Sequence, residues 1–417
     1  MTPTAQPAPA SPTAPTAIAE AEKLAWLRLI RTPQVGSKNF FYLLERAGSA
    51  QEALRLLPQL AKRGGAKSAS TGVLQPIAPE VAERELAQLA QLGGQLLIAA
   101  DAAYPPLLRA ISDAPPCISV LGNPAVLHRR LLAMVGTRHA SGNGIMLANQ
   151  FAQQLGEAGI ITCSGLARGI DTAVHRASLN TGTVAVLAGG IDQPYPPENR
   201  DLYRAIPAHG CVISEMPWGE VAQANHFPRR NRLISGLSLA VLVVEAARRS
   251  GSLITARMAA EQGREVMAIP GSPLDPRAQG SNDIIREGAL LVQSVADVVQ
   301  GLPNFEALRN QQAAAALTPG QPSLLADWPT APRSQSMPPA PIGKVHQPAI
   351  ASLAPDEKQV DRLRHRLLQL LSPTPIGLDA VIELLNAPPP EVLAAVTELE
   401  LAGLILRSPG DQLIRVG

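Results

Sequence analysis

The chain has 417 residues, enough for about two to four domains, and a formal net charge of +2 from 36 basic and 34 acidic residues. This balance excludes wholesale electrostatic attraction to nucleic acid, so any cationic binding surface must be local. The 3 cysteines lack metal-ligand spacing, which argues against a disulfide framework or a zinc site and indicates a reducing compartment.

The first part of the chain divides into a tail and a helical module. Residues 1–17 are mostly proline, alanine and threonine and lack the features of a secretion signal, so we predict a disordered tail. Residues 18–80 are predicted to form a helical module, with helical periodicity from Ile18 to about Leu60 and a glycine, lysine and serine linker over 62–71. Within it, VGSKNFFYLLERAGSAQEAL is typical of two short helices around a glycine turn, as in helix-hairpin or SAM-like modules. Such a turn can hold a DNA phosphate, although packing is its commoner role.

The central region, residues 81–302, alternates apolar runs of strand length with helical patterns. This order is typical of an α/β fold with a doubly wound parallel sheet. The strands are predicted at 131–135, 160–163, 184–187, 212–214, 239–244, 266–269 and 289–292. No run of the chain reaches membrane-spanning length, so we expect a cytoplasmic protein without membrane contact.

Glycine turns follow the first two of these strands, at the same edge of the predicted sheet. Arg138 and Ser141 lie in the first turn, and Gly165 and Arg168 lie in the second. Glycine lets the backbone approach an anion, the following helix offers free N–H groups, and arginine grips phosphate through two hydrogen bonds. We therefore expect phosphate binding at this edge. The G-x-G-x-x-G fingerprint is absent, and Ser164 stands where a dehydrogenase carries an acid, which argues against a nicotinamide enzyme.

Further cationic candidates follow the third predicted strand. Arg200 begins a helix after a glycine turn. Its guanidinium either points at the same edge of the sheet or belongs to an ordinary surface arginine. The segment NHFPRRNRLISGLS contains Phe227, Arg230, Asn231 and Arg232. Basic residues beside an aromatic ring suit single-stranded nucleic acid, because the arginines hold the backbone while the ring stacks on a base. The alternative places the ring in the core and the arginines on a solvated face.

The carboxylates do not form a recognisable catalytic set. Glu245 ends the most apolar strand and is either a catalytic acid or, more commonly, structural. Asp171 and His175 are spaced for a metal or proton relay, but Asp171 is more simply a helix N-cap and no third ligand is evident. We find no Walker loop, no Ser-His-Asp arrangement and no paired acids. No catalytic, cofactor or metal site is therefore predicted.

The last part of the chain comprises a spacer and a small domain. Residues 303–354 are rich in proline and alanine and are predicted to be a flexible linker. Residues 355–417 show three helical patterns and then a hairpin around SPGD, which predicts a winged helix. Its third helix carries Glu391, Glu398 and Glu400 but no basic residue. Because an acidic helix repels phosphates, we favour a protein-contact or capping role over duplex binding.

Six motifs, GTRHASGNG, SGLARGID, AGGIDQPYPPEN, HFPRRNRLISGLS, SGSLITA and AIPGS, together resemble the DNA-processing protein A (DprA/Smf) family. The resemblance covers about 104–300 and implies an extended Rossmann-like domain that forms a homodimer and binds single-stranded DNA without catalysis. It also implies a SAM-like module before this domain, a winged helix after it, and loading of RecA recombinase in natural transformation, with no cofactor. By motif, the DNA-contacting positions are Arg138, Ser141, Gly165, Arg168, Phe227, Arg230, Asn231 and Arg232.

Two other functions compete with this interpretation. Related Rossmann-like enzymes hydrolyse nucleotide monophosphates, and SGSLITARMAAE is faintly similar to their glycine-threonine-glutamate loop, with Glu261 as the candidate acid. The basic cluster and the added domains count against this phosphoribohydrolase. The other possibility is an interaction scaffold that recruits partners through its terminal modules.

Overall fold

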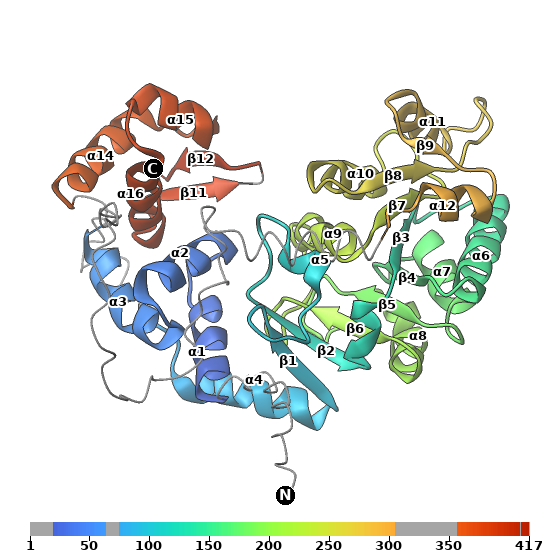
Figure 1. The fold of residues 1–417 in the computed structure, drawn as a ribbon, viewed down its shortest axis with the longest axis horizontal. Coiled ribbons are helices and arrows are strands. Elements are labelled where there is room, and N and C mark those ends of the chain that lie inside the picture. Colours follow the sequence, from blue (N-terminus) through green and yellow to red (C-terminus); the bar gives the residue numbers. More distant parts are fainter. Residues whose placement is uncertain (1–19, 64–74, 305–356, 409, 417) are drawn as a thin grey trace, which may run out of the picture.

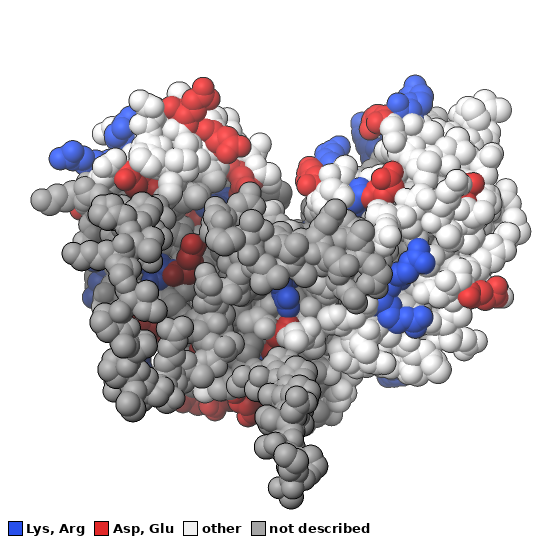
Figure 2. All heavy atoms as spheres, viewed as in Figure 1, with Lys and Arg blue, Asp and Glu red and all other residues white. Residues whose placement is uncertain are grey.

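The computed structural model describes residues 20–63, 75–304, 357–408 and 410–416. The predicted tail and nearly all of the predicted linker lie outside these residues. The described parts form two lobes: one contains the N-terminal helices and the winged helix, and the other contains the large sheet (Figure 1). Figure 2 shows a notch between the two lobes, with side chains of both charges on either side of it.

The N-terminal module consists of α1 (Glu20–Arg31), α2 (Ser37–Ala47), α3 (Ala50–Arg63) and α4 (Pro79–Gln91). The predicted helix pair around a glycine turn is confirmed, since α2 ends at Gly48, whose φ of 79° few other residues adopt. Trp26 and Phe40 fill the module's core, with their ring centroids 4.8 Å apart. Arg31 pairs with Glu85 of α4 at 2.8 Å and also donates to carbonyl groups after β6, which ties the module to the sheet.

The large sheet has nine strands in the order β1-β2-β6-β5-β4-β3-β7-β8-β9. The strands are β1 (Gly94–Ile98), β2 (Cys117–Gly122), β3 (Leu131–Val135), β4 (Ile161–Ser164), β5 (Thr183–Val186), β6 (Cys211–Ser214), β7 (Ala240–Val243), β8 (Glu265–Ala268) and β9 (Leu290–Leu291). All predicted strands are confirmed, as β3 to β9, with ends that agree to within one residue. They pair in parallel, as predicted.

The sheet also contains two strands that the sequence pattern did not predict. β1 and β2 pair antiparallel with each other, and β2 pairs antiparallel with β6. Antiparallel neighbours need no crossover helix between them, so the alternation of strand and helix that marks β3 to β9 is missing here. The predicted parallel sheet thus carries two further, antiparallel strands at one edge.

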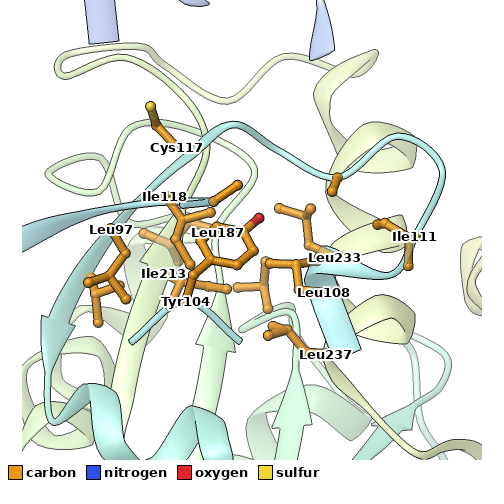
Figure 3. Packing of buried hydrophobic residues seen from close by; sticks show 14 of the residues in the cluster. Leu97, Tyr104, Leu108, Ile111, Cys117, Ile118, Leu187, Ile213, Leu233 and Leu237 are labelled. Atoms are coloured by element: carbon orange, nitrogen blue, oxygen red, sulfur yellow. The ribbon is translucent and has the colours of Figure 1, made fainter. Parts of the chain in front are cut away.

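Helices cover both faces of the sheet. They are α5 (Pro106–Arg109), α6 (Gly142–Glu157), α7 (Ile170–Ala177), α8 (Arg200–Ala205), α9 (His226–Leu237), α10 (Gly251–Glu261), α11 (Gln279–Arg286) and α12 (Val295–Gly301). Alternate residues of β3 face α9 and α10 on one side and α6, α7 and α12 on the other. Figure 3 shows Leu233 and Leu237 of α9 packed towards Tyr104 and Leu108, so α9 is held rigidly against the sheet.

The strand order reverses at β3, because β4 to β6 lie on one side of it and β7 to β9 on the other. In doubly wound sheets, ligands bind outside the carboxyl ends of the strands at this switch point. The fold therefore directs attention to the turns that follow β3 and β7.

The predicted winged helix is confirmed. It consists of α14 (Glu357–Leu370), α15 (Leu378–Leu385), α16 (Pro389–Leu401) and a small sheet of β10 (Ile376–Gly377), β11 (Ile405–Ser408) and β12 (Gln412–Arg415). The domain packs on the N-terminal module, with α16 against α3 (Figure 1).

Candidate nucleic-acid interface

A cavity of about 370 Å³ opens at the switch point. It is lined by the turn after β3, the second glycine turn, the first part of α9 and the start of α10. Four of the predicted site residues line it: Arg138, Phe227, Arg230 and Asn231. The sheet thus brings together residues up to 93 positions apart in sequence, from 138 to 231.

Phe227 is the centre of a cationic and aromatic cluster in this cavity. The guanidinium carbons of Arg138 and Arg230 lie 5.0 and 5.9 Å from the centroid of its ring. The Tyr195 ring meets it edge-on at a centroid distance of 5.8 Å. Phe227 is half-buried, whereas Arg138 is exposed and has no ion-pair partner among the described residues. The cluster therefore offers an unneutralised charge beside an aromatic surface.

Tyr195 is the residue that sequence reasoning missed. Tyr195 is 44% exposed, and its ring meets that of Phe227 edge-on. The sequence feature that could have identified Tyr195 is its place in the motif AGGIDQPYPPEN, since the chain has only 4 tyrosines.

Arg230 is buried beneath the cavity. Its side chain donates to the carbonyl oxygens of Gly165 and Val186, at the ends of β4 and β5, and to the Asn231 side chain. Any side chain at Gly165 would overlap the guanidinium, which explains the glycine there. Burial lowers the pKa of Arg230 to about 10, and the charge of Asp171 opposes this shift. Arg230 therefore links the ends of β4 and β5 and also presents its charge to the cavity.

Asp171 is not the N-cap of α7, so that prediction is wrong. The N-cap is Gly169, at φ 75°, and Asp171 lies inside the helix. Its carboxylate accepts from the backbone N–H groups of Gly165 and Ala167 at 3.1 and 3.3 Å. Burial raises the pKa of Asp171, against the effect of the Arg230 charge. The amides of the second turn, which we expected to meet a phosphate, are therefore already occupied.

His175 does not form a relay with Asp171. Its Nδ1 lies 2.8 Å from the Thr183 hydroxyl, and burial lowers its pKa to about 3, so the ring is neutral at physiological pH. In the part of the chain that the structure describes, no three His, Cys, Asp or Glu side chains form a group able to hold a metal ion.

The first turn is also capped by a carboxylate. The Ser141 hydroxyl accepts from the Gly144 N–H at 2.9 Å, while the hydroxyl and the backbone N–H of Ser141 donate to Glu245. A carboxylate at a helix N-terminus complements the helix dipole, which supports the structural interpretation of Glu245. Ser141 does not line the cavity.

The fourth turn differs from the first two, since its cap is neutral. The Ser250 hydroxyl caps α10, and Gly251 and Ser252 line the cavity directly. An anion in the cavity would meet this helix end without a resident carboxylate.

The remaining predicted residues lie outside the cavity. Arg168 pairs with Glu198 at 2.6 Å and lines a neighbouring hollow of about 310 Å³. Arg200 is exposed and lines neither hollow. Arg232 is 8% exposed and pairs with Glu215 and Asp113, which fixes α9 to adjacent loops. The alternative of a solvated basic face therefore fails for Arg230 and Arg232, because both are buried.

A doubly wound sheet with a cationic, aromatic cavity at its switch point is the architecture of Rossmann-like proteins that bind nucleotides or nucleic acids. The family model for DNA recombination-mediator protein A matches residues 95–303. Models for the DprA-like N-terminal HHH domain and the DprA winged helix domain match residues 20–87 and 351–411. The chain belongs to the DNA recombination-mediator protein A (DprA/Smf) family, as its motifs predicted.

Curated relatives and a solved structure agree with this assignment. Protein Smf of Escherichia coli is 36% identical over 331 residues, which cover 79% of each chain. DNA processing protein DprA of Bacillus subtilis is 41% identical over 203 residues, 48% of this chain and 68% of that one. The X-ray structure of DprA from Streptococcus pneumoniae matches with a TM-score of 0.56 and 34% identity, covering 68% of this chain and 98% of that one.

Proposed function

We propose that the protein binds single-stranded DNA at the cavity and, as a recombination mediator in natural transformation, helps to load RecA recombinase onto it without catalysing a reaction. The observation that carries this proposal is the Phe227 ring beside Arg138 and Arg230 in an open cavity. Unpaired bases stack on such rings, whereas a duplex hides its base faces. The family description and the names of the relatives support a role in DNA processing.

The predicted site residues have different parts in this proposal. Arg138 holds a phosphate, Phe227 and Tyr195 contact bases, and Asn231 and the start of α10 complete the wall. Arg168 lies alongside, at the neighbouring hollow. Arg230 lines the cavity from beneath and ties its floor to β4 and β5. The other four shape the site or lie outside it: Ser141, Gly165, Arg200 and Arg232.

The phosphoribohydrolase alternative lacks an acid in the right place. Glu261 is the last residue of α10, exposed and outside the cavity lining. A helix rises 1.5 Å per residue, so Glu261 lies roughly 13 Å along α10 from Ser252. Asp171, the carboxylate in the lining, is occupied by backbone amides. We therefore favour the non-enzymatic function.

The cytoplasm is the proposed location. All three cysteines, Cys117, Cys163 and Cys211, are free and buried, as a reducing compartment permits. Among the helices of the described residues, none is both long and apolar enough to cross a membrane.

The proposed function is tested by fluorescence anisotropy with a labelled oligo-dT and a matched duplex, at several salt concentrations. We expect tighter binding of the single strand, with affinity falling as salt rises by a log-log slope of about −0.7 for each neutralised phosphate. The RecA step is tested separately, by measuring whether the protein restores RecA ATPase activity on DNA coated with a single-strand-binding protein. Equal affinity for the duplex, or no single-strand binding at low salt, would contradict the proposal.

The homodimer proposed for the Rossmann-like domain is supported by an apolar sheet edge. β9 pairs only with β8 among the described strands, and Leu290 and Leu291 are 36% and 43% exposed. Exposed apolar edge strands are templates for pairing with another chain. We expect Leu291→Lys to convert a dimer into a monomer in light scattering, whereas Val221→Lys, at an exposed loop valine, leaves the mass unchanged. A dimer that survives Leu291→Lys would place the interface elsewhere.

A further inference from the structure

The third helix of the winged helix is buried on all sides. Every residue of α16 from Ala394 to Leu401 is buried, and two of them, Glu398 and Glu400, are charged. A helix that packs only within a winged helix keeps one face in water, and this is the face that reads duplex DNA. The second face of α16 lies instead against α3 of the N-terminal module.

Each module contributes an apolar side chain to the core of the other. Leu401, at the end of α16, is 1% exposed and belongs to the apolar cluster that includes the N-terminal helices, not to the core of its own domain. Tyr42 of α2 packs in the opposite direction, against the winged-helix core. Burial raises the pKa of Tyr42. The contact therefore has a desolvated centre with a side chain from each partner.

Polar groups surround this centre. Lys38 of α2 pairs with Asp411 in the turn between β11 and β12. Glu400 pairs with Arg407 at 3.2 Å, and burial raises its pKa against the effects of Arg407 and Asn39. An apolar centre with a polar rim is the anatomy of a specific protein interface.

We propose that the winged helix is a protein-recognition domain whose third helix is reserved for the N-terminal helical module of the same chain, and does not read duplex DNA. The proposal is independent of the single-strand site. It accounts for the acidic third helix, because Glu398 and Glu400 are balanced by Arg364 and Arg407 instead of facing a phosphate. The part of the domain that remains visible over α15 is acidic as well (Figure 2).

The docking also covers the start of α2. This helix begins after Gly36, and Lys38 lies in its first turn. Asp411 neutralises Lys38, and Gly403 lies so close to Gln34 that a side chain at 403 would press on it. The docking thus covers the third helix of the winged helix and the basic start of α2.

The experiment is hydrogen exchange, read by mass spectrometry, on the full-length protein and two variants. Leu401→Asp places a charge in the centre of the contact, and Leu406→Asp places the same charge on β11, where the leucine is 59% exposed. We expect Leu401→Asp to raise amide exchange in α2 and α3 by about tenfold or more, with Leu406→Asp unchanged. Exchange in α14 reports whether the winged helix itself stays folded. Unchanged exchange in α2 and α3 with a folded winged helix would overturn the proposal.

If Leu401→Asp unfolds the domain, charge-reversal variants of the Lys38–Asp411 pair test the docking instead. Lys38→Glu and Asp411→Lys should each raise amide exchange in α2 and α16, and the double variant should return it to the wild-type level. If neither single variant has any effect, the docking is refuted. Duplex affinity is measured on the same proteins, and the proposal requires it to stay within about twofold of wild type. A tenfold gain on release would mean that α16 is a hidden duplex reader, contrary to the proposal.

Discussion

Arg230→Ala is expected to lower the free energy of unfolding by about 2–6 kcal/mol, because it leaves two buried carbonyl oxygens without a donor, at about 1–3 kcal/mol for each. Arg230 is 5% exposed, and its guanidinium supplies the opposing charge to buried Asp171. The carbonyl oxygens that lose their donor are those of Gly165 and Val186. Urea unfolding, followed by circular dichroism, measures the loss.

The adjacent arginine provides a matched control. Arg229 is exposed and has no ion-pair partner among the described residues, so Arg229→Ala should change stability by no more than about 0.5 kcal/mol. Arg230→Lys keeps the charge and should lose less than Arg230→Ala. If Arg230→Ala is as stable as Arg229→Ala, the buried tie between β4 and β5 does not exist. In either case, loss of DNA binding by Arg230→Ala is interpretable only after its stability is known.

These arginines show what the sequence cannot distinguish. Arg229, Arg230 and Arg232 form one basic cluster in the sequence, yet α9 directs them to solvent, to the sheet edge and to Glu215. An α-helix has 3.6 residues per turn, so adjacent side chains point in different directions. Only their contacts in the folded protein decide which arginine stays unpaired. Arg138 and Arg230 line one cavity, as the predicted site requires, but the sequence overestimated how many arginines reach it.

The same limit applies to the glycine turns. Glycines and helix starts predicted free backbone donors after β3 and β4, but Glu245 and Asp171 occupy them. Glu245 is 104 residues from Ser141, and no local pattern reveals such a partner. The strands were predictable because their apolar runs are local. The docking of α16 was not, because it joins segments about 350 residues apart.

Phe227→Ala is expected to weaken oligo-dT binding by about 5- to 150-fold, equivalent to the 1–3 kcal/mol of one stacked base. The ring is half-buried in the cavity and edge-on to Tyr195. Because stacking involves no counterion release, the salt slope of binding should stay that of the wild type. Phe227→Leu preserves apolar bulk without an aromatic face and separates stacking from packing.

Arg138→Ala is expected to weaken the same binding differently, by reducing the salt slope by about 0.7, the value for one neutralised phosphate of a single strand. Arg204→Ala removes the same charge from an exposed position outside the cavity and should leave the slope unchanged. Because Arg138 lies over the Phe227 ring, the variant with both Phe227→Ala and Arg138→Ala should lose less binding free energy than the two single variants together. Strict additivity would show that the cation and the ring do not form one site. A salt slope lowered as much by Phe227→Ala as by Arg138→Ala would contradict the separate roles given to the ring and the charge.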